Sequence, residues 1–407
     1  MKIACVGGGP AGLYFSILMK LADPANEVTV FERNPAGVTY GWGVVFWDDL
    51  LDDLYRSDPV SAREIAASSV CWNGQEVRVG AGRPVFLGGS GFSVGRKRLL
   101  DILASRAMDL GVQVRFESPV HQPSDIGEAD LVIACDGANS QVRQRDAPEF
   151  QTEVDVGRNK YIWLGTHRVF DAFTFAFEKT PAGWIWFHAY YFDRETSTCI
   201  VECSPETWEG LAFDTLGADE SIRRLEEIFG AYLEGHPLIN QLRGQDRIPW
   251  LNFRRISNQA WVRGNIVLMG DAAHTTHFAI GSGTRLAIQD AIGLAGKLTQ
   301  HQDLGAALKA YEEDRRHDLL ALQSSARNST HWFEEVQSYI DQDAVEFGFS
   351  LWKRRGRSPA WRYQLHLATQ ISALRRLRRW FTAARRSVRA RRRARLAEKS
   401  SSRPQPS

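Results

Sequence analysis

The stretch that decides the fold is Gly7-Gly8-Gly9-Pro10-Ala11-Gly12, close to the start of the chain. A short apolar run, residues 3–6, precedes it, and Leu13, Ile17 and Leu21 follow it at helical spacing. Glycines at this spacing between a strand and a helix form the turn of a dinucleotide-binding unit. The first permits a tight turn, the second lets the backbone approach a pyrophosphate, and the third lets the helix pack on the strand. The stretch predicts a Rossmann-like α/β domain, with the pyrophosphate at the positive end of the helix.

Three acidic residues stand where such a domain binds its ligand. Glu32 ends a second expected strand and lies 20 residues beyond Gly12, the spacing at which a carboxylate meets a ribose. Asp136 and Asp271 each follow a further buried strand. Ligands of open α/β sheets bind at the carboxyl ends of the strands. An ordinary structural turn is the alternative for each segment taken alone.

Length and composition indicate a two-lobed globular protein. The chain has 407 residues, of which 43% are hydrophobic and 24% charged, so one hydrophobic core is not expected to serve the whole chain. Its five cysteines form no CxxC pair, so we expect neither a disulfide framework nor a zinc site. No apolar run reaches the roughly 20 residues of a membrane-spanning helix. We expect a cytoplasmic protein that binds no metal.

A change of pattern near residue 155 predicts a second domain inserted into the first. Between residues 161 and 203, aromatic segments alternate in polarity and are separated by Gly, Pro or Asp turns, which is typical of an antiparallel sheet. The α/β pattern returns near residue 260. We expect the nucleotide-binding domain over 1–150 and 259–335, and a substrate-binding β-sheet domain over 151–258. C-terminal helices are expected over 336–384 and a disordered basic tail over 385–407.

The turn segments, together with Arg96 ahead of an expected helix, resemble the single-component FAD-dependent aromatic hydroxylases, relatives of p-hydroxybenzoate hydroxylase. That family has the glycine turn, an internal Asp-Gly turn and a late Gly-Asp turn in this order. The resemblance covers about residues 1–335. It implies a FAD-binding domain of the p-hydroxybenzoate hydroxylase type, interrupted by an antiparallel substrate-binding sheet.

Further segments resemble a smaller group within this family. That group contains salicylyl-CoA 5-hydroxylase, the flavin domain of anthraniloyl-CoA monooxygenase and the tryptophan hydroxylase of violacein synthesis. The segments that carry this resemblance are residues 40–46, 157–166, 200–203 and 277–284. Residues 170–177 are more similar to the acyl-CoA members. The Arg-rich tail departs from the pattern of the group.

The resemblance implies which residues hold FAD. Asp271 is expected to bond a ribityl hydroxyl, and Gly281 and Gly283 to let backbone N–H groups face the flavin ring. NADH or NADPH is expected to bind transiently as co-substrate, because no separate nicotinamide domain is visible. The full set of implied cofactor contacts is Gly7, Gly9, Pro10, Ala11, Gly12, Glu32, Arg33, Val44, Arg96, Asp136, Gly270, Asp271, Gly281 and Gly283.

The resemblance also implies a reaction. NAD(P)H reduces FAD, O₂ forms a flavin C4a-hydroperoxide, and its distal oxygen hydroxylates an electron-rich aromatic ring. We expect an aromatic acyl-CoA such as salicylyl-CoA, hydroxylated at position 5. The alternatives are a free aromatic or indole substrate such as tryptophan, a halogenase or reductase reaction, and a flavoprotein recruited to a membrane or partner. The choice between NADH and NADPH and the oligomeric state stay open.

One aromatic strand, centred near residue 187, is expected to face the flavin. Its alternation puts Trp184, Trp186, His188 and Tyr190 on one sheet face. We expect Trp186, His188 and Tyr190, with His277 and Phe278, to line the substrate site. His188, Tyr190 and His277 are the catalytic candidates, which would orient or deprotonate the ring substituent. The alternative is that they are core residues with satisfied polar tips.

Charge is divided between body and tail. From residue 353 onward there are 18 Lys and Arg against one acid, whereas the earlier residues carry a net charge of −15. Apolar residues from Ile371 to Val388 recur on one helical stripe among the arginines. Such a helix can dock on the acidic body, or contact a membrane surface or an acidic partner. It can also attract the phosphates of a CoA thioester, for which Lys353, Arg354, Arg355 and the arginines near residues 375–379 are candidates. A nucleic-acid partner is not expected.

Overall fold

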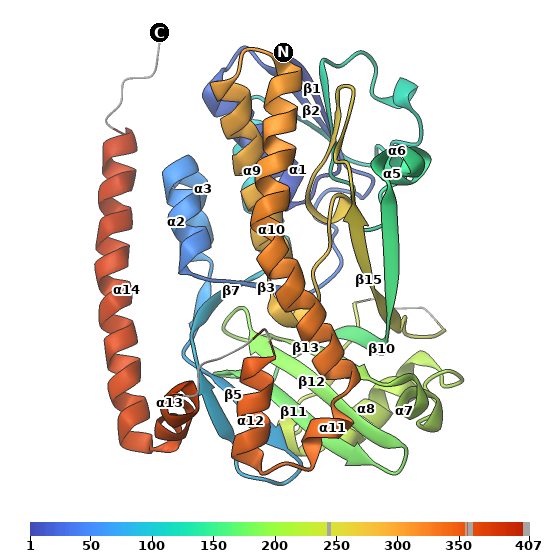
Figure 1. Cartoon of the computed structure of the whole chain (residues 1–407), viewed down its shortest axis with the longest axis vertical. Helices are drawn as coiled ribbons and strands as arrows, with labels where there is room; N and C mark the ends of the chain where they lie inside the picture. Colours follow the sequence, from blue (N-terminus) through green and yellow to red (C-terminus); the bar gives the residue numbers. More distant parts are fainter. Residues whose placement is uncertain (242–245, 355, 357–360, 402–407) are drawn as a thin grey trace.

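The protein is described by a computed structural model that covers the chain except residues 242–245, 355, 357–360 and 402–407. It has two lobes, at the top and bottom of Figure 1. In the upper lobe, a sheet has the spatial order β16 (Val262–Arg263), β17 (Ile266–Leu268), β9 (Leu131–Ala134), β1 (Lys2–Val6), β2 (Glu27–Phe31) and β8 (Gln113–Arg115). Its neighbouring strands are parallel except β16 and β17. The predicted Rossmann-like domain is confirmed.

Long helices cover this sheet. The helix α1 (Pro10–Ala22) contacts α4 (Arg96–Asp109) and α9 (Gly283–Gln300), and α9 contacts α10 (Leu304–Glu334). Of the three predicted apolar positions, Leu13 and Ile17 are buried in the resulting core, whereas Leu21, near the end of α1, is exposed. The long α10 continues diagonally into the lower lobe (Figure 1). The short helices of this lobe are η1 (Pro123–Asp125), α5 (Gln141–Arg145), α6 (Ala147–Phe150), η2 (Gly270–Ala272) and η3 (Phe278–Ile280).

The lower lobe is built on a second sheet. Its spatial order is β14 (Leu238–Ile239), β10 (Thr152–Thr166), β13 (Ser197–Cys203), β12 (Gly183–Tyr191), β11 (Phe173–Thr180), β5 (Gln75–Val79) and β6 (Val85–Gly88), and β15 (Leu251–Asn258) also pairs with β10. The predicted antiparallel pairing holds for β10 to β13. One difference is that β5 and β6 precede residue 150 and join this sheet through a parallel pairing of β5 with β11. The inserted sheet therefore also uses strands from the first segment.

The two faces of this sheet pack against different helices. On one face, Phe187 contacts Phe229 of α8 (Ala218–Leu233), next to α7 (Pro205–Gly210). On the other face, Trp186 and His188 contact Phe333 near the end of α10. The predicted alternation along β12 is confirmed, and the face that carries Trp186 and His188 points toward the end of α10.

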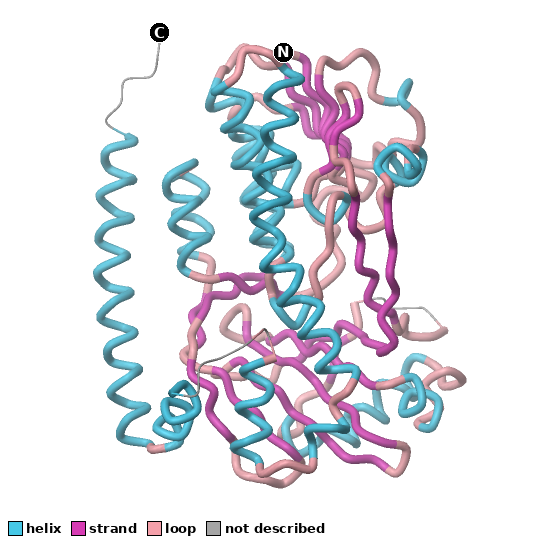
Figure 2. Tube along the Cα trace, viewed as in Figure 1, coloured by secondary structure: helices cyan, strands magenta, loops and turns pink. Residues whose placement is uncertain are grey.

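A small sheet and a long ribbon join the lobes. The sheet has the order β3 (Gly43–Phe46), β7 (Gly91–Gly95) and β4 (Val70–Trp72), and α2 (Asp48–Ser57) and α3 (Pro59–Ala67) follow β3. The pairing of β10 with β15 forms the long two-stranded ribbon that runs between the lobes in Figure 2. These connections bring the end of β12 close to β3.

The C-terminal segment is helical. It comprises α11 (Gln337–Ile340), α12 (Ala344–Lys353), α13 (Trp361–Gln370) and α14 (Ser372–Ser401). The expected disorder from residue 385 is not what the structure shows, because α14 continues to Ser401; residues 402–407 lie outside the described residues. Arg393 pairs with Asp48 and Asp52, and Arg389 with Asp48, so α14 is held beside α2 (Figure 1). A segment whose composition alone indicated disorder is thus helical and forms ion pairs with the acidic body.

Candidate functional site

Four adjacent parallel strands bring the predicted motifs together. The strands β17, β9, β1 and β2 are neighbours in the sheet and run in the same direction. The Gly270-Asp271 turn, Asp136, the glycine turn and Glu32 follow these strands in that order. Because the carboxyl ends of parallel strands lie at one edge of a sheet, all four segments line the same edge. The sequence predicted these strands and turns, and the structure adds the order in which the strands lie side by side in the sheet.

The glycines of the first turn have distinct steric reasons. Gly7 has a φ of 117°, which favours glycine, and a Cβ there would overlap the carbonyl group of Cys135. A Cβ on Gly12 would overlap the carbonyl oxygen of Gly7, so only glycine lets α1 approach β1 this closely. A Cβ on Gly9 would have no neighbouring atom within 4 Å. Gly9 caps α1 and borders open space at the positive end of that helix.

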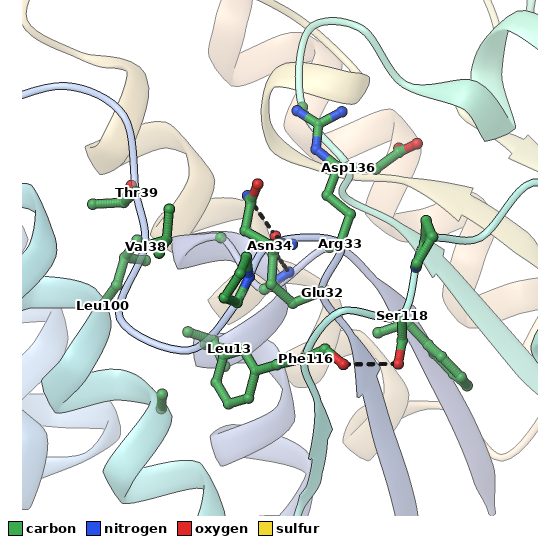
Figure 3. A pocket seen from close by; sticks show the side chains of 18 of the residues that line it. Leu13, Glu32, Arg33, Asn34, Val38, Thr39, Leu100, Phe116, Ser118 and Asp136 are labelled. Carbon is green, nitrogen blue, oxygen red and sulfur yellow. Dashed lines mark hydrogen bonds between the residues drawn. The ribbon is translucent and has the colours of Figure 1, made fainter. Parts of the chain in front are cut away.

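Glu32 lies in the wall of a cavity of about 490 Å³, shown in Figure 3. The Gly8 N–H donates to its Oε2 at 2.8 Å. The backbone N–H and the side-chain amide of Asn34 donate to its Oε1 at 2.8 and 2.7 Å. A carboxylate has about four lone-pair sites, so Glu32 keeps acceptor capacity for a ribose hydroxyl. The exposed Arg33 lines the same cavity.

Arg96 begins α4 and lines the cavity as well. Its Nε donates to Thr39 Oγ1 at 3.2 Å. Burial lowers the pKa of Arg96, while the negative charges of Asp271 and Glu32 raise it. An arginine stays protonated in proteins, so this guanidinium is a fixed cation near two carboxylates. Such a group suits a phosphate-rich ligand.

The Asp-Gly turn has an unpaired acceptor. The Gln141 N–H donates to Asp136 Oδ2 at 2.7 Å, whereas Asp136 Oδ1 is buried and has no hydrogen-bond donor in the described part of the chain. Arg143 donates to the carbonyls of Ala272 at 3.0 Å and Ala138 at 2.7 Å, and so ties this turn to the Gly-Asp turn. A buried carboxylate oxygen without a donor is costly, and a bound ligand would relieve that cost.

A buried network supports the Gly-Asp turn from below. The Gly270 N–H donates to Asp290 Oδ2 at 3.0 Å, His274 Nε2 lies 2.8 Å from the same oxygen, and Arg315 Nε donates to Asp290 Oδ1 at 2.9 Å. Burial alone would raise the pKa of Asp290, but the charges of His274 and Arg315 outweigh burial and leave it lowered. Asp290 therefore stays ionised and fixes the backbone next to Asp271.

Asp271 is exposed to solvent on one side, although many protein atoms surround its carboxyl group. That packing raises the pKa of Asp271, and the charges of His274 and Arg96 oppose the rise. Gly283, the first residue of α9, lies beside it: a Cβ there would be 3.9 Å from Asp271 Oδ1. The carboxylate is thus available to a hydroxyl next to the start of α9.

The turn before α9 packs against β3. Gly281 has a φ of 66°, and a Cβ there would meet Val45 and Trp47. Val44 is itself buried in the core of the upper lobe. Its neighbour Val45, rather than Val44, is therefore the side chain of β3 that lies against Gly281.

A second polar cluster lies on the face of β12 and centres on Glu202 of β13. Trp186 Nε1 donates to Glu202 Oε2 at 3.2 Å, and Asn159 Nδ2 donates to Glu202 Oε1 at 2.8 Å. Burial raises the pKa of Glu202, and the charge of His277 partly opposes the rise. Glu202 is the buried acceptor around which the predicted substrate residues gather.

His188 is enclosed and unpaired. Its Nε2 lies 3.5 Å from Glu202 Oε2, which would be an ion pair only with a protonated ring. Burial lowers the pKa of His188 well below its ordinary value, so the ring is neutral near pH 7. Neither ring nitrogen has a hydrogen-bond partner among the residues that the structure describes. The rings of Phe175, Phe278 and Phe333 surround it, with centroids 5.0, 5.6 and 4.9 Å away.

A turn from the upper lobe completes this cluster. The Ala279 N–H donates to His277 Nδ1 at 3.3 Å, and burial lowers the pKa of His277 to about 4. Arg354, just after α12, donates to the Ala279 carbonyl at 2.9 Å and to Ser329 Oγ at 3.0 Å, and its guanidinium lies over the Phe333 ring at 5.5 Å. Arg354 is buried and its guanidinium is used inside the protein, so it does not offer a surface for the phosphates of a CoA thioester. Arg355 lies outside the described residues, and the expectation for Lys353 and for the arginines near residues 375–379 stays a prediction.

Tyr190 stands apart from this group. Its hydroxyl donates to the Gly43 carbonyl at 2.7 Å, and its ring stacks on Phe173 with centroids 5.1 Å apart. Burial raises the pKa of Tyr190 above its ordinary value. The structure therefore brings Trp186, His188, His277 and Phe278 together and uses the Tyr190 hydroxyl to join β12 to β3.

Sequence reasoning missed three members of the cluster: Asn159, Glu202 and Arg354. Glu202 gave a signal, because it is a lone acid in an otherwise uncharged, buried strand, and acids are almost never fully buried without a partner. Arg354 gave no signal for a place in this cluster, because the basic segment around it indicated a phosphate-binding role instead. Across the described ranges, no His, Cys, Asp and Glu side chains form a group of three that could hold a metal, and no helix is long and apolar enough to cross a membrane.

Comparison with known proteins defines the class. The family model for an FAD binding domain matches residues 91–322. The salicyloyl-CoA 5-hydroxylase of a Streptomyces species is 42% identical over 84% of this chain and 66% of its own length. The 3-hydroxy-4-methyl-anthranilyl-[aryl-carrier protein] 5-monooxygenase of Streptosporangium sibiricum is 34% identical over 87% of this chain and 96% of its own. A solved 2-methyl-3-hydroxypyridine-5-carboxylic acid oxygenase superposes with a TM-score of 0.67 at 20% identity, over 88% of this chain and 98% of its own, and shows the same fold.

The fold is therefore that of an FAD-binding protein. The chain belongs to the family of FAD-dependent aromatic monooxygenases. The match with the Streptomyces relative spans just under two thirds of that longer protein.

Proposed function

We propose that this protein hydroxylates the ring of an aromatic acyl thioester, such as salicylyl-CoA at position 5, with FAD, NAD(P)H and O₂. The balanced reaction converts ring C–H, O₂, NAD(P)H and H⁺ into ring C–OH, H₂O and NAD(P)⁺. Support comes from the Streptomyces relative at 42% identity and from the Streptosporangium relative, whose name also specifies a ring bound to a carrier. Bound FAD supplies the redox chemistry, and the protein supplies binding, orientation and exclusion of water.

The carboxyl edge of the upper sheet offers a partner for each polar part of FAD. Glu32 would accept from the adenosine ribose, and the start of α1 beside Gly9 would face the pyrophosphate together with Arg96. Asp271 would accept from the ribityl chain, and the start of α9 at Gly283 would lie next to the ring. The donor-free Asp136 Oδ1 and the open space at Gly9 are the observations that favour this fit.

The proposed binding of the aromatic ring rests on His188. A buried imidazole with both nitrogens unpaired costs free energy that a bound hydroxyl or amino group would recover. Because the pKa of His188 is lowered, its neutral ring is a hydrogen-bond acceptor and a weak base. We therefore assign His188 to orienting the electron-donating ring substituent, with Glu202 3.5 Å away as the further acceptor for its proton. The surrounding phenylalanines would exclude water, as this chemistry requires.

The test is a substrate screen with the holoenzyme. Salicylyl-CoA, anthraniloyl-CoA, free salicylate and tryptophan are each incubated with NADH or NADPH, while cofactor oxidation and product mass are followed. A thioester product that gains one oxygen atom, with little turnover of the free acids, is the expected result. Turnover of tryptophan alone would refute the thioester proposal and support the free indole alternative.

A variant pair links this activity to the cluster. His188→Ala should lower the rate of ring hydroxylation about 10²-fold or more while FAD content stays normal. His301→Ala, at an exposed position after α9, is the matched control and should behave as wild type. Equal rates for His188→Ala and wild type would return His188 to a purely structural role.

A further inference from the structure

The C-terminal helices expose an unusual number of large apolar side chains. Nine of the 19 exposed large hydrophobic residues in the described part of the chain lie between Trp361 and Val388. On α14 they include Leu374, Leu377, Phe381 and Val388, which we call the apolar row. The exposed fraction of these four side chains runs from 43% to 67%. The remaining exposed hydrophobic residues are scattered over the body and need no explanation.

The apolar row points away from the body because α14 docks by its arginines. Arg393 pairs with Asp48 and Asp52, Arg386 donates to Asn73 Oδ1 at 2.9 Å, and the Arg375 guanidinium lies 3.7 Å from the Phe86 ring centroid. At 3.6 residues per turn these three arginines fall on one stripe, and the apolar row falls on a different stripe. An amphipathic helix ordinarily docks by its apolar side. Here the apolar side is left free for another surface.

Unpaired cations flank the apolar row. At the same helical spacing Arg385, Arg391 and Arg392 lie beside or within the row; all three are exposed, and none forms an ion pair within the described ranges. A second copy of this chain packed on the same face would bring these charges together, which Coulomb repulsion opposes. The charges instead fit a partner that is anionic.

We propose that the apolar row and its flanking arginines dock on the surface of an anionic lipid bilayer. Leucine and aromatic residues on one side of a helix and arginines beside them are the composition of helices that lie in the membrane interface. Anionic headgroups attract such basic segments and so add to the apolar contribution. The 30-residue α14 runs straight along the outer edge of the molecule (Figure 1), which presents the row to a plane. This inference does not depend on the substrate.

Vesicle binding by the full-length holoenzyme tests the proposal. The protein should sediment with vesicles of phosphatidylcholine mixed with phosphatidylserine and stay in solution with phosphatidylcholine alone. Added salt should weaken the binding, because it screens the arginines. Absence of binding to the mixed vesicles, or equal binding to both kinds, would overturn the proposal.

Variants locate the contact. Phe381→Glu should reduce vesicle binding by about tenfold or more, because burial of one large apolar side chain contributes at least that much. Leu320→Glu, at a position that is 61% exposed on α10, is the matched control and should bind as wild type. The flavin absorbance of each variant reports folding. Unchanged vesicle binding by Phe381→Glu would refute the lipid surface. So would a wild-type protein that binds no vesicles but has a doubled mass in solution that Phe381→Glu abolishes, because the row would then contact a second copy of the chain.

Discussion

Exchanging glycines of the first turn for alanine should separate folding from cofactor binding. In Gly12→Ala the new methyl group overlaps the Gly7 carbonyl oxygen, which belongs to the backbone and cannot move away easily. Overpacking of this kind costs about 1–3 kcal/mol of the free energy of unfolding. In Gly9→Ala the methyl group meets no protein atom within 4 Å, and the φ of −77° suits alanine. The apoprotein should then be as stable as wild type or about 0.4–1 kcal/mol more stable.

For the affinity for FAD the order of the two variants should be reversed, so that Gly9→Ala is affected more than Gly12→Ala. The methyl group of Gly9→Ala occupies the space through which a pyrophosphate approaches the start of α1. Loss of one hydrogen bond to a charged group, about 1.5–3 kcal/mol, weakens binding about ten- to a hundredfold. Urea unfolding of the apoproteins and fluorescence titration with FAD give both quantities. The reasoning is refuted if Gly9→Ala binds FAD with the wild-type Kd, or if Gly12→Ala unfolds at the wild-type urea concentration.

Three further predictions follow from the site. Asp271→Ala should weaken FAD binding about ten- to a hundredfold in the same titration, and full occupancy in that variant would contradict the role of Asp271 at the ribityl chain. The pKa of His277 falls from 6.5 to about 4 in the folded protein, so between those pH values only the unfolded chain binds this proton. The free energy of unfolding should therefore drop by about 3 kcal/mol as the pH falls from 6.5 to 4. Urea unfolding at these two pH values should show a smaller drop for His277→Phe, whereas an unchanged drop would exclude His277 as its source. Arg354→Met should lower the free energy of unfolding by at least about 1–3 kcal/mol, because it leaves the Ala279 carbonyl without its donor. Lys353→Met, at the exposed neighbouring position, is the control and should not lower it. Equal stability of the two variants would contradict the contact assigned to Arg354.

Much of the upper lobe could be predicted from sequence because its signals are local. The glycine turn, Glu32 and the two Asp turns each combine a strand with a fixed spacing, and the structure places all of them at one edge of the sheet. The alternation that grouped Trp186 with His188 is equally local.

The parts that sequence missed depend on contacts between distant segments. Glu202 joins the cluster through its pairing opposite Trp186, and Arg354 reaches Ala279 from 75 residues away. Tyr190 follows the predicted alternation, yet its hydroxyl is used by Gly43 of another sheet. The ion pairs of α14 likewise involve acids of α2 that no local pattern in the tail reveals.

The most direct test of the central claim is the origin of the oxygen in the product. The holoenzyme is supplied with NAD(P)H and salicylyl-CoA under isotopically labelled O₂, and the product is analysed by mass spectrometry. The account predicts one labelled oxygen atom on the ring for each NAD(P)H that is productively oxidised. A hydroxylated ring without the label, or oxidation of NAD(P)H with no ring product from any aromatic thioester, would contradict it.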